Sequence, residues 1–504
     1  MNTAKKSALA GTVGLALAAA LPYNAAAAGA PPAPWVAHTP LHVANYSGAR
    51  VAAAITNPSP QGYIPCDIRT AYYLTSVGGT GSGQLVAVVD AFADPSLASD
   101  LAAFDAAFAL PAPSSLTQVA PYGTAATTQS NLQGWQLEEA LDVEWVHSIA
   151  PGANLALVEA RSDGVADLLN AIGYAVSTLH SNVVSMSWGG AEFFGEGGYD
   201  SNFPNHSGVM FLAAAGDSGS GAEWPSSSPN VVSVGGTSLS SAATGDGTSS
   251  HTTCSGTGTG SNSSLETAWS GSGGGISAFE AIPGYQGTYG GAVSGAASIS
   301  ALTGGKRGTP DVAAIANPVT GVAVYDTAGY QSQSGWFQVG GTSLAAPVWA
   351  AIVALADQKR ASAGAPDLSI GAGQATSPLY SPAPGMFTDI TSGSNGACGT
   401  NCNAGAGYDL VSGVGAPIGT RFDSRAPVNQ IVGSTPPVRS PVAQSGAGAT
   451  PGPRTPVQPS ARLTNVQPLP AAASPLVSAA AKSPDAPWPA WPTGFFVSMR
   501  LRLA

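Results

Sequence analysis

The sequence of 504 residues predicts an α/β fold in which a mostly parallel sheet carries helices on both faces within a single large domain. Short runs of apolar and β-branched residues, typical of buried strands, alternate along the chain with longer segments of helical pattern. A strand, a helix and a second strand in succession normally form a parallel crossover. Because the carboxyl ends of parallel strands meet at one edge, functional groups are expected at that edge.

The expected strands are short apolar, β-branched runs; they are 85–90, 154–160, 183–188, 209–216, 231–236 and 322–326. The expected helices are longer and lie between or after these runs, at 95–110, 135–150, 163–179 and 343–360. Segment 238–264 has neither period, so we expect a surface insertion there.

The two ends of the chain differ in composition from its centre. Residues 1–28 combine a basic start, an apolar run and small residues, which indicates a cleaved secretory signal and a secreted product, extracellular or periplasmic. The alternative, a membrane anchor, is disfavoured because the run is short for a span. Residues 29–58 are interpreted as a short N-terminal arm or pro-segment, and 59–424 as the main domain. Residues 425–504 are rich in Pro, Ala and Ser, which predicts a disordered tail.

The charge balance argues against some partners. The net charge is −11 with 17 Lys plus Arg, so the basic patches that a nucleic-acid binder needs are not expected. Charged residues make up 9% of the chain, and few cations remain to repel one another when carboxylates neutralise in acid. This fits an acid-exposed protein, although a secreted protein rich in Gly, Ser and Ala would look similar. After removal of the signal, no membrane association is expected.

Four cysteines are present, and disulfides are allowed in an exported protein. Cys398 and Cys402 lie in "CGTNC", a loop that could close locally. Cys66 and Cys254 could pair across the fold, but the sequence does not establish it. His251, three residues before Cys254, is the one histidine close in sequence to either pair, which argues against zinc.

The stretch "GGTSLAAPVWA" places Ser343 behind a glycine turn and before an apolar helix, so Ser343 is a candidate nucleophile that needs a base. None of the histidines stands in an "HGT"-like turn, and each is interpreted as structural; they are His38, His42, His147, His180, His206 and His251. Carboxylates are the better candidates for the base.

Glu138 and Asp142 are four residues apart on a predicted helix, so both side chains lie on one face and within reach of each other. Two carboxyls this close share a proton and can accept and return the serine proton. Glu139 lies about 100° around the helix and is expected to be solvated. Taken alone the spacing is weak, since many exposed helices carry it by chance.

Asp217 follows a strand-like run in "FLAAAGDSGSG", where glycines allow a sharp turn at a strand end. A protonated aspartic acid can donate a hydrogen bond to an oxyanion, and the backbone N–H of Ser343 could be the second donor. The alternative is that Asp217 caps a turn.

The ordered motifs "EEALD", "AAAGDSGS" and "GGTSLAAP" resemble the sedolisins, or serine-carboxyl peptidases, which are secreted acid proteases with a subtilisin-like fold. The resemblance covers about residues 60 to 424. It implies that Ser343 is the nucleophile of a peptidase, Glu138 the general base and acid, Asp142 its orienting partner, and Asp217 the oxyanion donor. Peptides and proteins would be the substrates, and we expect a monomer.

The resemblance implies two further sites. The strand "SWGG" resembles the edge that pairs with substrate backbone, which makes Ser187, Trp188, Gly189 and Gly190 candidate substrate-binding residues. One calcium ion is implied near the C-terminal part of the domain. Its ligands would be the carboxylates of Asp389 and Asp409 and the carbonyls of Ile390, Gly405 and Gly407.

The sequence departs from this family where most members carry a long folded prosegment, since about 30 residues stand here between the signal and the domain. Asp90 occupies the position where a subtilisin would keep its catalytic aspartate, and we interpret it as structural or supporting. Two alternatives remain: a neutral subtilisin-like protease that uses Asp90 and Ser343, and an inactive binding module on the same fold.

Overall fold

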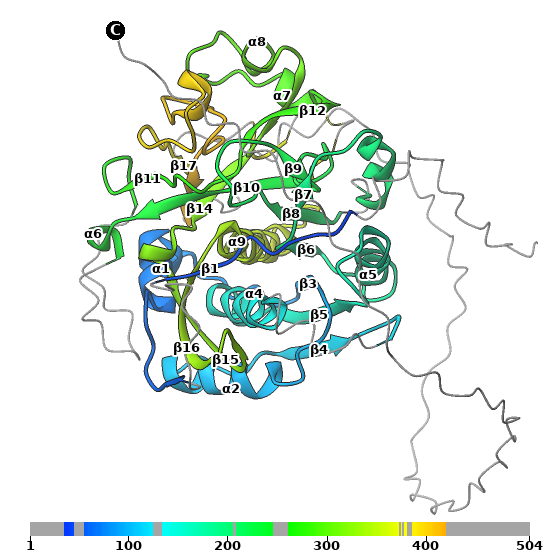
Figure 1. Cartoon of the computed structure of the whole chain (residues 1–504), viewed down its shortest axis with the longest axis vertical. Coiled ribbons are helices and arrows are strands. Elements are labelled where there is room, and N and C mark those ends of the chain that lie inside the picture. The colour runs from blue at the N-terminus through cyan, green and yellow to red at the C-terminus, as the bar shows by residue number, and fades with distance from the viewer. Residues whose placement is uncertain are drawn as a thin grey trace, which may run out of the picture. The chain divides into compact units, whose positions relative to one another are not determined.

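An eight-stranded sheet runs through the centre of the described structure (Figure 1). Seven strands follow in the order β11-β10-β8-β6-β3-β5-β4, and β14 pairs with β10. Every pair is parallel except β10 with β11. The strand bounds are β3 Leu85–Ala91, β4 Ser115–Val119, β5 Asn154–Ala160, β6 Val183–Met186, β8 Met210–Ala214, β10 Val232–Leu239, β11 Glu266–Ala268 and β14 Val312–Ile315. The predicted parallel α/β architecture is therefore confirmed.

This computed structural model describes residues 35–44, 55–123, 134–204, 208–244, 261–371, 374, 377–380 and 386–419, all within one compact unit. The predicted signal at 1–28 and the predicted tail at 425–504 lie outside the described residues.

Helices cover both faces of the central sheet, as the alternation predicts (Figure 1). On one face α4 (Trp135–Ile149) packs against α9 (Thr342–Ser362), and α2 (Leu97–Phe108) packs against α4. On the other face α5 (Val165–Ser177) packs against β3 and β5. Alternate residues of β3 enter two separate apolar cores, because successive side chains of a strand point to opposite faces.

A second, mainly antiparallel sheet lies beside α4. It contains β1 (His42–Val43), β16 (Gln333–Gly340) and β15 (Val322–Tyr330), and β2 (Ile55–Asn57) pairs with β16 in parallel. The expectation that 322–326 joins the parallel sheet is wrong, because β15 turns directly back into β16 as a hairpin. Two strands from the N-terminal arm complete this sheet, so part of the arm belongs to the folded domain.

The remaining elements are short. The paired strands are β7 Gly190–Ala191, β9 Glu223–Trp224, β12 Gly275–Ala281, β13 Lys306–Thr309, β17 Phe387–Thr388 and β18 Ala416–Pro417. The short helices are α1 Pro65–Ala71, α6 Ser241–Thr244, α7 Gly284–Gly287, α8 Ile299–Thr303, and the 3-10 turns η1 Leu74–Ser76, η2 Glu196–Asn202, η3 Pro318–Thr320 and η4 Gly399–Cys402. None of the described helices has both the length and the apolar character required to cross a membrane.

The prediction that residues 238–264 form a surface insertion is wrong at both ends of this segment. Residues 238–239 complete β10, α6 follows at Ser241–Thr244, and residues 245–260 lie outside the described residues. At the far end Ser261 is buried and its hydroxyl donates to Glu266. The polar composition of this stretch concealed these two attachments to the core.

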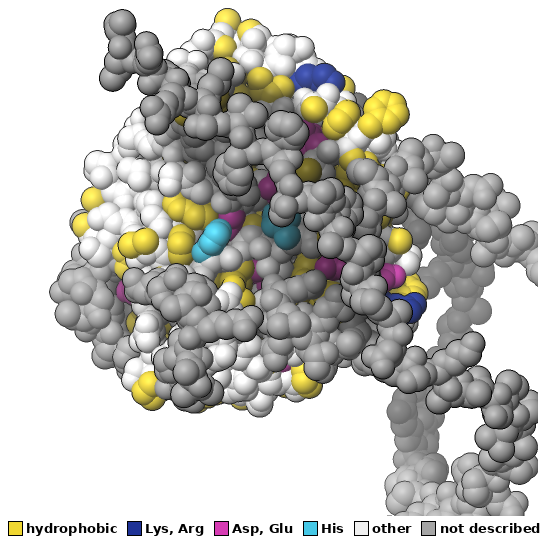
Figure 2. Space-filling model, viewed as in Figure 1, with side chains coloured by type: hydrophobic (Ala, Val, Ile, Leu, Met, Phe, Trp, Pro, Cys, Tyr) yellow, Lys and Arg dark blue, Asp and Glu magenta, His cyan; other side chains and the backbone are white. Residues whose placement is uncertain are grey.

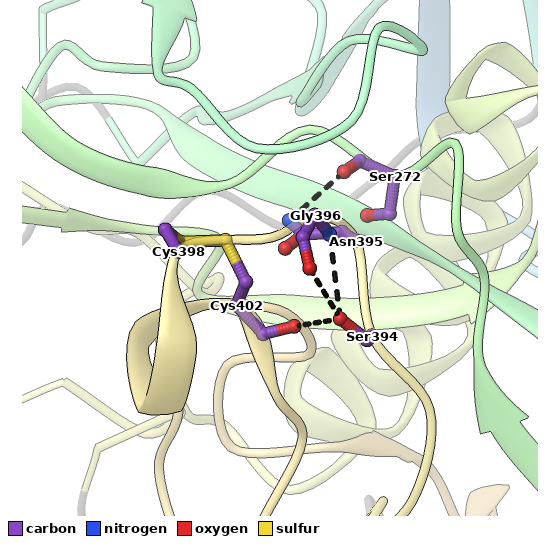
Figure 3. Close-up of a disulfide and its surroundings, with 6 residues drawn as sticks. All are labelled: Ser272, Ser394, Asn395, Gly396, Cys398 and Cys402. Atoms are coloured by element: carbon purple, nitrogen blue, oxygen red, sulfur yellow. Dashed lines mark hydrogen bonds between the residues drawn. A yellow bond between two sulfur atoms is a disulfide. The ribbon is translucent and has the colours of Figure 1, made fainter. Parts of the chain in front are cut away.

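A disulfide closes the loop after β17 (Figure 3). Cys398 and Cys402 are joined with their Cα atoms 5.3 Å apart, as the short spacing suggested. Nearby, the side-chain amide of Asn395 donates to the carbonyl of Ser272 at 3.0 Å, and the Asn395 carbonyl accepts from the Ser220 amide at 2.8 Å. These bonds tie the C-terminal loop at Asn395 to Ser220, three residues after Asp217, and to Ser272, which follows β11. Cys66 is also disulfide-bonded, and Cys254 lies outside the described residues.

Candidate active site

Ser343 is the second residue of α9, and the glycine turn before it is required by geometry. Gly341 has φ +118°, a conformation that residues with a side chain rarely adopt. A Cβ on Gly341 would stand 2.0 Å from the Pro40 carbonyl oxygen and 2.6 Å from Asp217 Oδ2. The backbone that presents Ser343 is therefore packed directly against both of these groups.

We expect Gly341→Ala to reduce activity at Ser343 by about 100-fold or more, because the added methyl group must displace the start of α9, and an ångström of misplacement can cost that much. Activity and circular dichroism of the purified variant would be compared. Gly173→Ala in α5 is the matched control, since a Cβ there meets nothing within 4 Å; it should leave activity unchanged. Wild-type activity in Gly341→Ala would contradict the assignment of this turn.

The backbone carbonyl of Ser343 accepts a hydrogen bond from Ser187, the residue that follows β6. Pro347 stands four residues later in α9 and has no N–H, so it cannot donate the usual helix hydrogen bond to that carbonyl. Ser187 Oγ fills this gap, with an oxygen–oxygen distance of 3.1 Å to Ser343 O, and it also contacts Asp142 Oδ1 at 2.9 Å. Ser187 thus connects the backbone at Ser343 to one member of the predicted acid couple.

Glu138 and Asp142 lie on the face of α4 that packs against α9, and both side chains are fully buried. Burial raises the pKa of Glu138 well above its ordinary value, and the charges of Asp142 and Asp90 raise it further. Burial, and then the charge of Asp90, likewise raise the pKa of Asp142. The nearby hydroxyl of Ser343 acts in the opposite direction and lowers the pKa of Glu138, although neither Ser343 Oγ nor the Glu138 carboxyl oxygens have a hydrogen-bond partner. The predicted nucleophile therefore lies near the predicted base.

Asp217 lies beside the backbone amide of Ser343, after β8. Its Oδ1 accepts from the Thr342 amide and the Thr342 hydroxyl, both at 2.8 Å, so it caps the start of α9. Its Oδ2 is buried without a hydrogen-bond partner. Burial raises the pKa of Asp217 well above its ordinary value, which favours the protonated form that can donate. The two interpretations of Asp217, as a cap and as a donor, are compatible because each uses a different oxygen.

Glu139 corrects one expectation: its side chain is fully buried, not solvated. The second sheet covers the face of α4 that the helix pattern alone suggested was exposed, through contacts between α4 and β15. Asp90, at the end of β3, is also buried, and burial raises its pKa to about 8. The charge of Asp90 raises the pKa of Glu138, Glu139 and Asp142, so Asp90 acts on the acids of α4 electrostatically.

No histidine among the described residues interacts with Ser343. His147 is buried five residues after Asp142 on α4, and its Nε2 lies 2.7 Å from the Pro111 carbonyl and 3.3 Å from Asp105. His180 is exposed, and His206 and His251 lie outside the described residues. The neutral subtilisin-like alternative therefore finds no imidazole beside Ser343 in the described part of the chain.

His38 and His42 lie beside carboxyl groups near the candidate site. His42 Nε2 lies 3.4 Å from Asp217 Oδ2, and His38 Nε2 lies 3.5 Å from Glu223. Figure 2 shows histidine side chains beside acidic ones on this face of the molecule. The sequence analysis did not predict that these histidines lie near the site. The run "WVAHTPLHV" could have indicated it, because its large apolar residues are unusual within a Pro/Ala-rich arm.

The four residues of the "SWGG" segment have different surroundings. The Trp188 side chain is buried in the core on the α5 side and donates to the Val89 carbonyl at 2.8 Å, and the Ser187 side chain points to Asp142. Any contact of Ser187 or Trp188 with a bound peptide would therefore fall to the backbone, and the role of this segment in substrate binding stays a prediction. Gly189 exchanges backbone hydrogen bonds with His38, and Gly190 pairs with Trp224. The edge at Gly189 thus has the pairing capacity that the sequence suggested.

The five predicted calcium ligands come together in one loop region. The amide of Gly405 donates to Asp409 Oδ2 at 2.8 Å, and the amide of Gly407 donates to Asp389 Oδ2 at 2.9 Å. Both carboxyls therefore border the 405–407 turn, and Ile390 follows Asp389 directly. Within the described residues no group of three or more His, Cys, Asp or Glu side chains could hold a metal ion. A cation here would rely on backbone carbonyls, which suit calcium.

Comparisons with known proteins agree with this geometry. The model of the Subtilase family matches residues 117–370. Kumamolisin of Bacillus sp. (strain MN-32) is 32% identical over 390 residues, covering 72% of this chain and 63% of the relative. Sedolisin of Pseudomonas sp. (strain 101) is 30% identical over 405 residues, covering 75% of this chain and 63% of the relative. The chain thus spans a little under two thirds of the length of these relatives.

A solved structure extends the comparison to three dimensions. Pseudomonas sedolisin, described as a serine-carboxyl proteinase complexed with two molecules of pseudo-iodotyrostatin, superposes with a TM-score of 0.55 at 26% identity. The match covers 71% of this chain and 96% of that one. The chain therefore belongs to the subtilase family, and within it to the sedolisins.

Proposed function

We propose that this protein is a secreted, acid-active serine endopeptidase that hydrolyses peptide bonds through an acyl-enzyme. One observation carries the proposal: Ser343, in the first turn of α9, has the buried Glu138–Asp142 couple on one side, and Asp217 binds the amide of the preceding Thr342 with Oδ1 while its Oδ2 makes no hydrogen bond. A buried acid couple beside a serine is an arrangement for moving a proton. The subtilase matches support peptidase chemistry.

The first half of the reaction forms the acyl-enzyme. Ser343 Oγ attacks the peptide carbonyl carbon as its proton passes to Glu138, and Asp142 shares the proton held by the couple. The charge that develops on the carbonyl oxygen is met by the Ser343 N–H and by the protonated carboxyl of Asp217. Glu138 then gives its proton to the leaving amine as the C–N bond breaks.

The second half releases the acid product. Water replaces the amine, Glu138 accepts its proton, and hydroxide adds to the ester carbonyl before the bond to Ser343 Oγ breaks. The proton returns to Ser343, so the enzyme ends as it began. Ser187 acts through Asp142, because it fixes one carboxyl oxygen at 2.9 Å.

The pH profile tests this mechanism. We expect peptidase activity to be maximal in acid and to fall as pH rises, because Asp217 can donate a hydrogen bond only while it is protonated. Burial raises the pKa of Asp217, so the loss of its proton, and of activity, occurs at a higher pH than for an ordinary aspartic acid. At very low pH activity should also fall as the couple becomes doubly protonated. Hydrolysis of casein and of a peptide library from pH 3 to 8 provides the measurement. A maximum at pH 7 or above would contradict the proposal, as would casein cleavage at pH 4 by Ser343→Ala.

We also propose that Asp389, Ile390, Gly405, Gly407 and Asp409 hold one structural calcium ion, which would tie the last loops to the domain. Bordering carboxyls and a glycine turn support this. A chelator is expected to lower the melting temperature of the protein, and added calcium to restore it. In Asp389→Asn this chelator shift should largely disappear. Equal melting temperatures with and without chelator at pH 6 would exclude the ion.

A further inference from the structure

Ser187 lies where three elements of the candidate active site meet. It follows β6, and β6 packs against α9, which in turn packs against α4. Its side chain is fully buried, like those of Asp142 on α4 and Ser343 on α9. The next residue, Trp188, fixes the backbone from the opposite side, because its ring is buried in the core on the α5 side and donates to the Val89 carbonyl. The Ser187 hydroxyl is therefore held between the acid couple and the nucleophile.

The Ser187 hydroxyl has two acceptors but only one hydrogen. Its Oγ lies 2.9 Å from Asp142 Oδ1 and 3.1 Å from the Ser343 carbonyl oxygen. Because a hydroxyl donates through a single hydrogen, the two oxygens compete for it. An ionised Asp142 is the stronger acceptor, since hydrogen bonds to charged groups are about twice as strong as neutral ones. A neutral Asp142 loses that advantage and can itself donate to Ser187 Oγ, so the hydrogen of Ser187 then goes to the Ser343 carbonyl.

The Ser343 carbonyl lacks its usual helix donor because of Pro347. In an α-helix this carbonyl accepts from the amide four residues later, and proline has no amide hydrogen. Ser343 also carries the N–H that would bind the oxyanion, so a hydrogen bond to its carbonyl steadies that N–H as well. Pro347 therefore leaves the first turn of α9 with a contact that a side chain can make and release.

The charge state of Asp142 depends on groups from several elements. Glu138, one turn earlier on α4, forms the couple with it. Apart from the Ser343 hydroxyl of α9, the other groups that act on the couple are acidic; they are Asp90 on β3 and Asp217 after β8. Burial and the charge of Asp90 raise the pKa of Asp142, whereas the hydrogen bond from Ser187 lowers it. Ser187 thus influences the pH at which the couple takes up its second proton.

We propose that Ser187 is a positioning residue whose hydroxyl hydrogen turns toward Asp142 when that carboxyl is ionised and toward the Ser343 carbonyl when it is neutral. This inference rests on the proposed peptidase function. When the couple accepts the proton of Ser343, its negative charge is lost, and the hydrogen of Ser187 turns to the Ser343 carbonyl. The first turn of α9 is then held most firmly while the oxyanion is present. No bond breaks, because the hydroxyl only rotates about Cβ–Oγ.

Ser187→Ala in the full chain is the first test. Its kcat for a peptide at acid pH is expected to fall about tenfold or more, with KM within about twofold, because the nucleophile is less well held. The acid limb of its kcat profile should move up by about one pH unit, because ionised Asp142 loses a hydrogen bond. Ser185→Ala is the matched control and should change neither quantity. Ser185 lies in β6, is equally buried, and has no hydrogen-bond partner for its hydroxyl among the described residues.

Pro347→Ala separates the two bonds of the hydroxyl. Alanine supplies the missing amide, so the Ser343 carbonyl no longer competes for the hydrogen of Ser187, and the bond to ionised Asp142 gains. The acid limb should therefore lie at least about 0.3 pH unit below that of wild type. In Ser187→Ala/Pro347→Ala, kcat should recover to within about threefold of Pro347→Ala, while the acid limb stays where Ser187→Ala has it. An acid limb in Pro347→Ala equal to that of wild type, or a double variant as slow as Ser187→Ala, would overturn the proposal.

A spectroscopic titration does not depend on activity. In full-length Ser343→Ala, which should not digest itself, the infrared band of protonated carboxyl groups is followed with pH, and Asp142→Asn identifies the contribution of the couple. Adding Ser187→Ala should raise the midpoint of that contribution by about one pH unit, and an unmoved midpoint would refute the inference. If no chain hydrolyses peptides but the midpoint still moves, the proposed function is wrong and the link between Ser187 and Asp142 remains.

Discussion

Glu138→Gln is expected to lower kcat/KM for peptides by about a thousandfold at the acid optimum, with little change in KM. Glutamine keeps the size and the buried position of the side chain but cannot accept the proton of Ser343. The binding contacts and the oxyanion donors remain, so some activity above the uncatalysed rate should persist. Steady-state kinetics on a peptide substrate, with active-site titration, provide the measurement.

Glu139→Gln supplies the matched control for that experiment. Glu139 is the next residue of α4, is equally buried, and undergoes the same chemical change. It lies among Asp90, Glu159, Asp94 and Asp326, whose charges raise its pKa. We expect its kcat/KM to remain within about threefold of wild type. Equal losses in the two variants would indicate that burial of acids on α4, not the position beside Ser343, determines the activity.

Raising the pH from 4 to 8 is expected to reduce the free energy of unfolding substantially. Burial raises the pKa of Asp94 to about 6, of Asp326 to about 7 and of Asp90 to about 8. The unfolded chain releases these protons near pH 4, whereas the folded chain retains them. Between pH 4 and the folded pKa the unfolded state therefore binds fewer protons, and each such group lowers stability by up to about 1.4 kcal/mol per pH unit.

Urea unfolding at pH 4, 5, 6, 7 and 8, with calcium held constant, would measure this dependence. The stabilising contribution is complete below about pH 4 and is lost as the pH rises through the folded values. Glu139→Gln should show a shallower decline, because burial raises the pKa of Glu139 well above its ordinary value and glutamine does not titrate. A free energy of unfolding that increases steadily from pH 4 to 8 would contradict the burial of these acids in protonated form.

The local patterns were sufficient for most of the central architecture. Five of the six expected strands fall in the parallel sheet, and the four expected helices appear as α2, α4, α5 and α9. The strand at 322–326 was assigned to the wrong sheet, because an apolar run carries no information on its hydrogen-bonding partner. Glu139 was misplaced for a related reason: helical spacing separates the faces of α4 but does not reveal that a second sheet covers the polar one.

The sequence by itself determined the α/β class, the start of α9 next to Ser343 and the position of Glu138 and Asp142 on one face of α4, since each follows from spacing within a few residues. Tertiary structure alone decided that Asp217 reaches Thr342, that Ser187 joins Asp142 to the Ser343 carbonyl, and that residues 35–43 cross the site. These contacts join residues more than 40 positions apart, with most separations exceeding 100. Their partners are set by how strands and helices pack, which local spacing does not encode.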